Sequence, residues 1–131
     1  MTDVTPLVSP DAKLVQSYTA RGLRIAGSEY LGAVLIADNK VSALDVERPQ
    51  DLKPGHLAGL DGLNINFLII GAAKSAMLDA ALLTELKQRG IVAEVMEIGA
   101  ACRTFNVLLA EGRQVAAALI PAGPPPDKKL P

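Results

Sequence analysis

Residues able to take part in chemistry gather in one short stretch near the end of the chain, GAACRTFN, from Gly99 to Asn106. The stretch follows an apolar run expected to be a strand and opens a predicted helix. The first N–H groups of a helix and its partial positive charge can bind an anion. Arg103 and Thr104 could reinforce such a site, and Asn106 could orient a polar group of the ligand. This stretch is therefore a candidate site for a small anionic ligand.

A second turn could complete the same cleft. Gly71 and Ala72 follow another apolar run, from Ile65 to Ile70, which is also expected to be a strand. In open α/β sheets, ligands bind beyond the carboxyl ends of the parallel strands. The candidate ligand-binding residues are therefore Gly71, Ala72, Gly99, Cys102, Arg103, Thr104 and Asn106.

A purely structural explanation competes with this prediction. Gly71 and Gly99 would then permit tight strand-to-helix turns. In the same explanation Thr104 and Asn106 satisfy neighbouring backbone groups, and Arg103 is a surface side chain. One glycine after a strand is a much weaker signal than the three-glycine fingerprint of dinucleotide-binding folds. The sequence favours this structural explanation and leaves the other open.

Cys102 is a candidate nucleophile, because a thiol in the first turn of a helix can have a lowered pKa. Catalysis by a thiolate also needs a base, and the single histidine, His56, lies in a glycine-flanked segment whose distance from Cys102 the sequence does not fix. Cys102 also borders the apolar face of the predicted helix, where a free cysteine behaves as a small buried hydrophobe. We therefore expect Cys102 to be a packing residue. Since no catalytic set is complete, we expect no catalytic residues and no enzymatic activity.

Composition argues against several other classes of function. One cysteine and one histidine allow neither an intrachain disulfide nor a cysteine-rich or histidine-rich metal site, so we expect no metal and no cofactor. Thirteen basic residues against fourteen acidic ones, with two Phe, two Tyr and no Trp, argue against nucleic-acid binding. No uninterrupted apolar run approaches the roughly 20 residues of a membrane helix. We expect a soluble protein of a reducing compartment, without direct membrane insertion.

The second half of the chain alternates between strand and helix patterns. Aliphatic runs predict three strands that are parallel or mostly so, because strand–helix–strand connections pair strands in parallel. Asp79 is the expected N-cap of the first helix, and Gly90 and Gly112 are the expected stops of the two helices. The predicted strands are Ile65–Ile70, Ile91–Met96 and Val115–Ile120, and the predicted helices are Ala80–Arg89 and Ala100–Glu111.

Leucines at helical spacing indicate the buried faces of these two helices. In the first helix we expect Leu82, Leu83 and Leu86 to point inward. In the second helix, one face carries Ala101, Phe105, Leu108 and Leu109.

The first half of the chain has the short runs and tight turns of antiparallel β structure. A small helix is expected after it, with Leu57, Leu60 and Leu63 on one side. Residues 1–13 are expected to be a flexible N-terminal arm, 14–121 a single α/β domain, and 122–131 a disordered, proline-rich tail. The predicted strands of this half are Leu14–Thr19, Leu23–Ala26, Tyr30–Ala37 and Val41–Val46.

Three stretches carry a resemblance to a known family: GAACRTFNVLLAEGRQVAAALIP, the strand FLIIG and the strand GIVAEVM. The specific part is ACRTFN followed by EGR, and weaker similarity extends upstream, so that residues 18–121 are covered. The chain resembles the family that includes mitochondrial complex I assembly factor 3, an adipogenesis-associated vertebrate protein and small uncharacterised bacterial and archaeal proteins. The loop after Gly71 departs from that pattern, because it lacks a further glycine and a proline-rich turn. The departure argues against a phosphate-like cradle in this loop.

The resemblance implies a three-layer α/β fold with a mixed central sheet, helices, and an added antiparallel β layer from the N-terminal half. It also implies a non-enzymatic, assembly-factor-like protein whose unknown partner is a protein, such as a membrane complex or its assembly machinery. A homodimer paired through the N-terminal strands is a further possibility. No mitochondrial presequence is visible, so we expect a bacterial cytoplasmic protein, and a mitochondrial one only if a presequence has been trimmed. The alternative function is small-ligand or anion binding, enzymatic or not, in the cleft at Gly71 and Gly99–Asn106.

Overall fold

The computed structural model describes residues 12–73 and 77–121. The predicted arm and tail, 1–13 and 122–131, lie almost wholly outside this part of the chain and stay predictions. The strands are β1 (Val15–Tyr18), β2 (Gly22–Ile25), β3 (Ser28–Leu31), β4 (Ala33–Ala37), β5 (Lys40–Leu44), β6 (Phe67–Ala72), β7 (Val92–Glu97) and β8 (Val115–Leu119). The helices are α1 (Ala80–Gln88) and α2 (Ile98–Ala110), with two 3₁₀ helices, η1 (Pro49–Asp51) and η2 (Pro54–Leu60).

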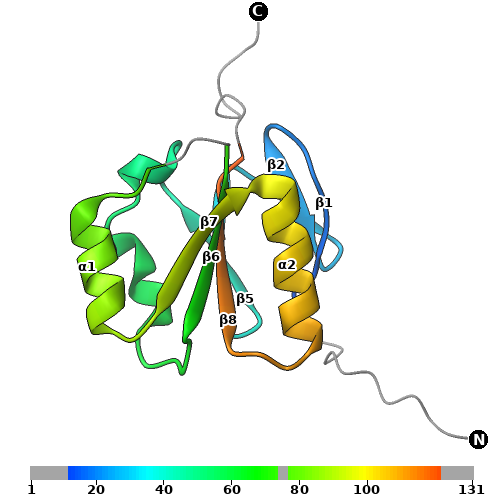
Figure 1. Ribbon diagram of the computed structural model, residues 1–131. Coiled ribbons are helices and arrows are strands. Elements are labelled where there is room, and N and C mark those ends of the chain that lie inside the picture. Colours follow the sequence, from blue (N-terminus) through cyan, green and yellow to red (C-terminus); the bar gives the residue numbers. More distant parts are fainter. Residues whose placement is uncertain (1–11, 74–76, 122–131) are drawn as a thin grey trace, which may run out of the picture.

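These elements form three layers (Figure 1). The middle layer is a five-stranded mixed sheet with the strand order β5-β4-β8-β6-β7. Leucines of α1 and η2 pack on one face of this sheet. The other face is covered by α2 and by a separate antiparallel sheet of β1, β2 and β3. The predicted fold class, including the added β layer from the N-terminal half, is confirmed.

The three strands of the second half are parallel, as predicted: β6 pairs in parallel with both β7 and β8. The last strand, β8, lies in the middle of the sheet because its other side pairs antiparallel with β4. Strand β8 is buried along its whole length, and three of its five side chains are alanine. Small side chains at the centre of the sheet let both outer layers pack closely on it.

The predicted strand Tyr30–Ala37 is wrong in one respect, because Gly32 divides it into β3 and β4. Gly32 has a φ of +82°, a conformation that glycine adopts without strain, and the chain turns there. As a result β3 stays in the three-stranded sheet, whereas β4 enters the central one. The first half of the chain thus contributes to two layers.

A tight turn joins β4 to β5. Ala37 pairs with Lys40, so the loop consists of Asp38 and Asn39 alone. Both loop residues have positive φ, +52° and +62°, as a type I′ hairpin requires, and Asp and Asn tolerate this conformation better than most residues. The turn therefore has a defined backbone conformation.

Helix α1 begins as predicted, with the Asp79 carboxylate accepting a hydrogen bond from the Leu82 N–H at 3.3 Å. Leu82 and Leu86 are buried, but the prediction that Leu83 points inward is wrong, because 47% of Leu83 is exposed. Leu82 and Leu86 lie four residues apart on one face, whereas Leu83 lies about 100° around the helix. Since α1 packs on the sheet by one face only, Leu83 is left at the surface.

Helix α2 begins at Ile98, two residues before the predicted start, and ends at Ala110. Gly112, the predicted stop, follows with a φ of +77°. Ala101 and Phe105 are fully buried, and Leu108 and Leu109 pack partly buried on the same cluster. The predicted apolar face of this helix is therefore confirmed.

Candidate functional site

Gly71 and Ala72 lie inside β6 and are buried, whereas the sequence placed them in a loop after the strand. A Cβ atom added to Gly71 would lie 2.6 Å from the Ala101 Cβ and 2.9 Å from the Leu119 Cδ2. Both distances are below those of ordinary van der Waals contacts. Gly71 therefore allows α2 to pack directly against β6, and its Cα faces side chains of the core.

The amino end of α2 carries a carboxylate from the chain itself. The Glu97 side chain accepts hydrogen bonds from the Gly99 N–H at 2.9 Å and the Ala100 N–H at 3.3 Å. These two bonds, the former being the stronger cause, hold the pKa of Glu97 below its ordinary value. The N–H groups on which the predicted anion site depended are thus already bonded to a negative charge.

Tyr18 of β1 is a second residue that sequence reasoning missed at this end of the sheet. A Cβ atom on Gly99 would collide with the Tyr18 phenol oxygen, so the ring lies directly over the first turn of α2. Tyr18 is 42% exposed. No local sequence signal could reveal this contact, because the two residues belong to different elements and lie far apart in the chain.

Asn106 joins α2 to β1 through the backbone of Val15. Its side-chain oxygen accepts from the Val15 N–H at 2.9 Å, and its amide nitrogen donates to the Val15 carbonyl at 2.8 Å. Both hydrogen-bonding capacities of the amide are used in holding the two elements together. Nearby, Thr104 is half-buried and Arg103 is exposed on the same helix.

The Cys102 thiol is buried, with 5% of the residue exposed. Burial raises the pKa of the Cys102 thiol to about 11, and the Glu97 carboxylate adds to this shift while Arg103 opposes it. Since the thiolate is the nucleophilic form, burial and this raised pKa disfavour a nucleophilic role for Cys102 at neutral pH. His56 lies on η2, on the other face of the sheet, where its Nδ1 accepts from the Lys53 N–H at 2.9 Å. The structure does not bring these two residues together.

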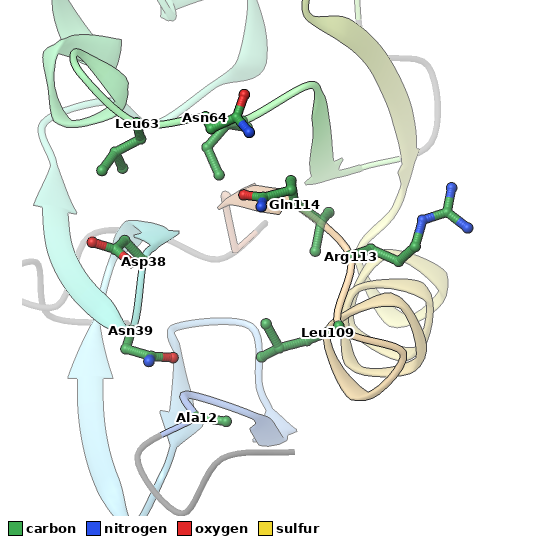
Figure 2. Close-up of a pocket in the computed structure, with 11 residues that line it drawn as sticks. Ala12, Asp38, Asn39, Leu63, Asn64, Leu109, Arg113 and Gln114 are labelled. Atoms are coloured by element: carbon green, nitrogen blue, oxygen red, sulfur yellow. The ribbon is translucent and has the colours of Figure 1, made fainter. Parts of the chain in front are cut away.

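Open space lies at the opposite end of the parallel strands, where β6 and β8 begin. A cavity of about 290 Å³ is bounded there by the β4–β5 turn, the segment before β6 and the carboxyl end of α2. Figure 2 shows the Asn39 and Gln114 carboxamides and the Leu109 side chain pointing into it, whereas Arg113 points away. The lining residues are Ala12, Asp38, Asn39, Leu63, Asn64, Ile65, Leu109, Gly112, Arg113, Gln114 and Val115.

A second cavity, of about 470 Å³, adjoins the first, because Asp38 and Leu63 line both. It lies between the β4–β5 hairpin and η2, with Lys40 and Asp61 among its lining residues. Sequence reasoning found neither cavity, since their walls come from segments that only the folded sheet brings together.

Within residues 12–73 and 77–121, no cluster of three or more His, Cys, Asp or Glu side chains could hold a metal ion. In the same part of the chain, neither helix has the length and apolar character needed to cross a bilayer.

The chain matches one protein family over almost all of its described length. The family described as protein of unknown function (DUF498/DUF598) matches residues 15–120. The mouse protein named NADH dehydrogenase (ubiquinone) 1 alpha subcomplex assembly factor 3 is 34% identical, over 92% of this chain and 66% of its own. The human protein of that name is 35% identical, over 84% and 61%. The chain therefore spans less than two thirds of these relatives' lengths.

A bacterial relative and two solved structures are also similar. An uncharacterised Rhodobacter capsulatus protein is 37% identical, over 82% of this chain and 83% of its own. A Bordetella pertussis protein described as a Mth938-like domain has a TM-score of 0.78 at 24% identity, over 97% of this chain and 96% of its own. A Bartonella henselae structure described as an outer membrane protein has a TM-score of 0.77 at 31% identity, over 86% and 97%.

Proposed function

This chain belongs to the DUF498/DUF598 family, and from that premise we propose that it is a non-enzymatic, assembly-factor-like protein that acts by binding another protein. The mouse and human relatives are named as assembly factors of the NADH dehydrogenase 1 alpha subcomplex. The partner proposed for this chain is accordingly a subunit or an assembly intermediate of a membrane-bound NADH dehydrogenase.

The observation that carries this proposal is the filled carboxyl end of the parallel strands, where α/β folds usually bind small ligands. Ala101 and Leu119 pack against Gly71, Tyr18 covers Gly99, and Glu97 bonds the first N–H groups of α2. These contacts leave Cys102 buried and protonated. Such a site favours a structural role for the stretch, so that function is better sought at the surface.

Two further features belong to this proposal. The protein would act in the bacterial cytoplasm, or in mitochondria if a presequence has been removed. It would work either as a monomer or as a homodimer paired through strands of the three-stranded sheet, whose outer strands β1 and β3 each have one free edge in the described part of the chain. Light scattering of the purified protein distinguishes the two states.

Co-purification from the native organism tests the proposal. A tagged copy, cross-linked in cells and recovered under denaturing conditions, should enrich subunits of the NADH dehydrogenase over a tagged unrelated protein of similar size. In a deletion strain, the wild type should restore membrane NADH dehydrogenase activity. Cys102→Ala should restore it equally well, because the thiol serves only packing. The proposal fails if no subunit is enriched, and its non-enzymatic part fails if folded Cys102→Ala does not complement.

The anion-binding alternative at Gly71 and Gly99–Asn106 stays a prediction. Thermal unfolding against a panel of anionic metabolites tests it, since a ligand at about 100 times its Kd adds roughly 2.7 kcal/mol to the stability. A stabilisation that Arg103→Ala removes would favour this alternative over protein binding.

A further inference from the structure

Strand β7 forms one outer edge of the central sheet, and among the described strands it pairs only with β6. In Figure 1 it lies at the near edge of the sheet, with α1 and α2 on either side. The Val92 N–H donates to the Asn66 carbonyl at 3.0 Å, and in a parallel ladder every second residue bonds to the same neighbour. Val92 and Glu94 therefore direct their backbone groups toward β6. The N–H and C=O groups of Ala93 and Val95 point away from the sheet and can bond to a further strand.

Strand β7 lacks the features that protect the other outer strands. Native proteins shield sheet edges with lysine, proline, bulges or very short strands. Strand β5 begins with the exposed Lys40, β1 has an irregular register between Val15 and Ser17, and β3 has four residues. The six residues of β7 include no lysine or proline, and their register with β6 has no shift. Of these edges, β7 is the best suited to pair with another chain.

The face of β7 that is turned to α2 carries an apolar and an acidic side chain at the surface. Val92, Glu94 and Met96 share this face, since strand side chains alternate, and Met96 packs on the cluster that includes α2. Val92 is 62% exposed. Glu94 is also exposed, and it takes part in none of the ion pairs between described residues. A strand added to this edge would lie beside both side chains.

Helix α1 adds an exposed leucine on the other face of the sheet. It packs over β7, whereas η2 packs over β4, farther from this edge. Arg89 of α1 lies 2.9 Å from Asp61 at the end of η2, and Glu85 is on the same flank, 4.0 Å from Arg89. Leu83 lies about 160° around the helix from Glu85. Its side chain, 47% exposed, is therefore on the flank of α1 turned to the free edge of β7.

The Glu94 carboxylate favours one kind of added strand over another. Two copies of this chain could pair antiparallel through β7, with Ala93 of each opposite Val95 of the other. The two Glu94 side chains would then lie directly opposite each other, and like charges in such a position are destabilising. A basic residue opposite Glu94 would instead form a favourable cross-strand pair. The charge of the edge thus fits a basic strand better than a second copy.

We propose that the free edge of β7 receives an extended strand of a partner protein, with lysine or arginine opposite Glu94 and apolar residues on either side of it. This inference rests on the proposed protein-binding function and names the chemistry that the partner carries. The backbone of Ala93 and Val95 supplies the hydrogen bonds, as in other cases of strand addition to a sheet edge. Val92 and Leu83 supply apolar contacts on the two faces, and Glu94 selects for the basic residue.

Titration of the ¹⁵N-labelled protein with a capped peptide, acetyl-Thr-Val-Thr-Lys-Thr-Val-Thr-amide, tests the inference by NMR. Its two valines and its lysine lie on one face of an extended strand. We expect saturable shifts and slower amide hydrogen exchange at Ala93 and Val95. The same peptide with glutamate in place of lysine should bind about fivefold more weakly. Absence of saturable shifts with the lysine peptide, or equal binding of both peptides, would overturn the inference.

A charge reversal separates the site from general electrostatics. Glu94 is exposed, so Glu94→Lys should fold and should prefer the glutamate peptide. Glu47→Lys makes the same change at an exposed residue before η1, and should keep the preference of the wild type. An unchanged preference in Glu94→Lys would overturn the pairing with Glu94.

A dilution series of the protein alone tests self-pairing. Shifts at Ala93 and Val95 that grow with protein concentration, without peptide, would make a second copy the occupant and overturn the basic strand. Co-purification still decides the proposed function in either case, because a partner can be recovered whichever surface it binds.

Discussion

The two ends of the parallel strands differ in what occupies them. At the carboxyl end, side chains of this chain fill the space between β6, α2 and β1, and the Glu97 carboxylate accepts hydrogen bonds from the first N–H groups of α2. At the amino end, polar side chains from three segments surround a cavity of about 290 Å³. In the described part of the chain, the end that α/β folds usually use for ligands is filled around Gly71 and Gly99, and the cavity of about 290 Å³ lies at the other end.

The structural contacts of the stretch from Gly99 to Asn106 explain its unusual residue types. Gly99 makes room for Tyr18, Cys102 fills the core, and Asn106 bonds to Val15. Each of these three residues has a structural partner in the described part of the chain. If this explanation is right, substitutions at Gly71 and in this stretch should lower stability, whereas those of cavity-lining side chains should leave it nearly unchanged.

Gly71→Val should give the largest effect. The new Cβ would lie 2.6 Å from the Ala101 Cβ, so α2 would have to move away from the sheet. Overpacking of this kind costs about 3 kcal/mol, which urea unfolding followed by circular dichroism would measure. Gly55→Ala is the matched control, since its added Cβ meets nothing within 4 Å. A Gly71→Val protein as stable as the control would show that the carboxyl end is not tightly filled.

Asn106→Ala should have the next largest effect. It removes both hydrogen bonds to Val15 and leaves that backbone N–H and C=O without their partners. The expected loss is about 2 kcal/mol of unfolding free energy. Relative to the wild type, amide hydrogen exchange should become faster in β1 and change less in β6. A loss shared equally by all strands would contradict a specific role in holding β1.

Glu97→Gln should change how stability depends on pH. The pKa of Glu97 in the folded protein is held below the ordinary value of 4.5. Its carboxylate therefore stabilises the fold above about pH 4.5, and this contribution is lost as the pH falls through the lowered pKa. Wild type should have the higher Tm at about pH 7, and the difference should shrink by about pH 3. A difference that stays constant with pH would contradict the capping role.

Gln114→Ala should have the smallest effect on stability. The side chain is exposed and points into the cavity, so its removal should change the unfolding free energy by less than about 0.5 kcal/mol. Urea unfolding measures this change. A loss above about 1 kcal/mol would mean that the amide supports the fold, and would weaken the contrast between the two ends.

Much of the fold could be predicted because its signals are local. Asp79 and Gly112 mark helix ends by their own chemistry, and the apolar strands are recognised by their composition. The errors have two causes. The start of α2 moves to Ile98 because the neighbouring Glu97 caps the helix. The split at Gly32 depends on a partner far along the chain, because β4 pairs with β8 and so leaves the sheet that holds β3.

The candidate site was harder to predict than the fold. The sequence singled out Gly71, Gly99 and Asn106, but their partners Ala101, Tyr18 and Val15 come from other elements. Only packing reveals whether a glycine beside a strand faces a ligand or a side chain. The cavity walls around Asn39 and Gln114 carry no motif, because each residue is an ordinary turn or loop amide until the sheet forms.

The central place of β8 has a consequence for the newly made chain. Among the described strands, β4 and β6 have no pairing with each other and are joined only through Val115–Leu119, the last of these strands to be synthesised. Until that segment leaves the ribosome, the β4–β5 hairpin and the β6–β7 pair each present an unpaired, apolar edge. Such edges are the surfaces on which nascent chains associate wrongly. The addition of β8, whose centre is three alanines, therefore pairs both edges and ends this exposure in the nascent chain.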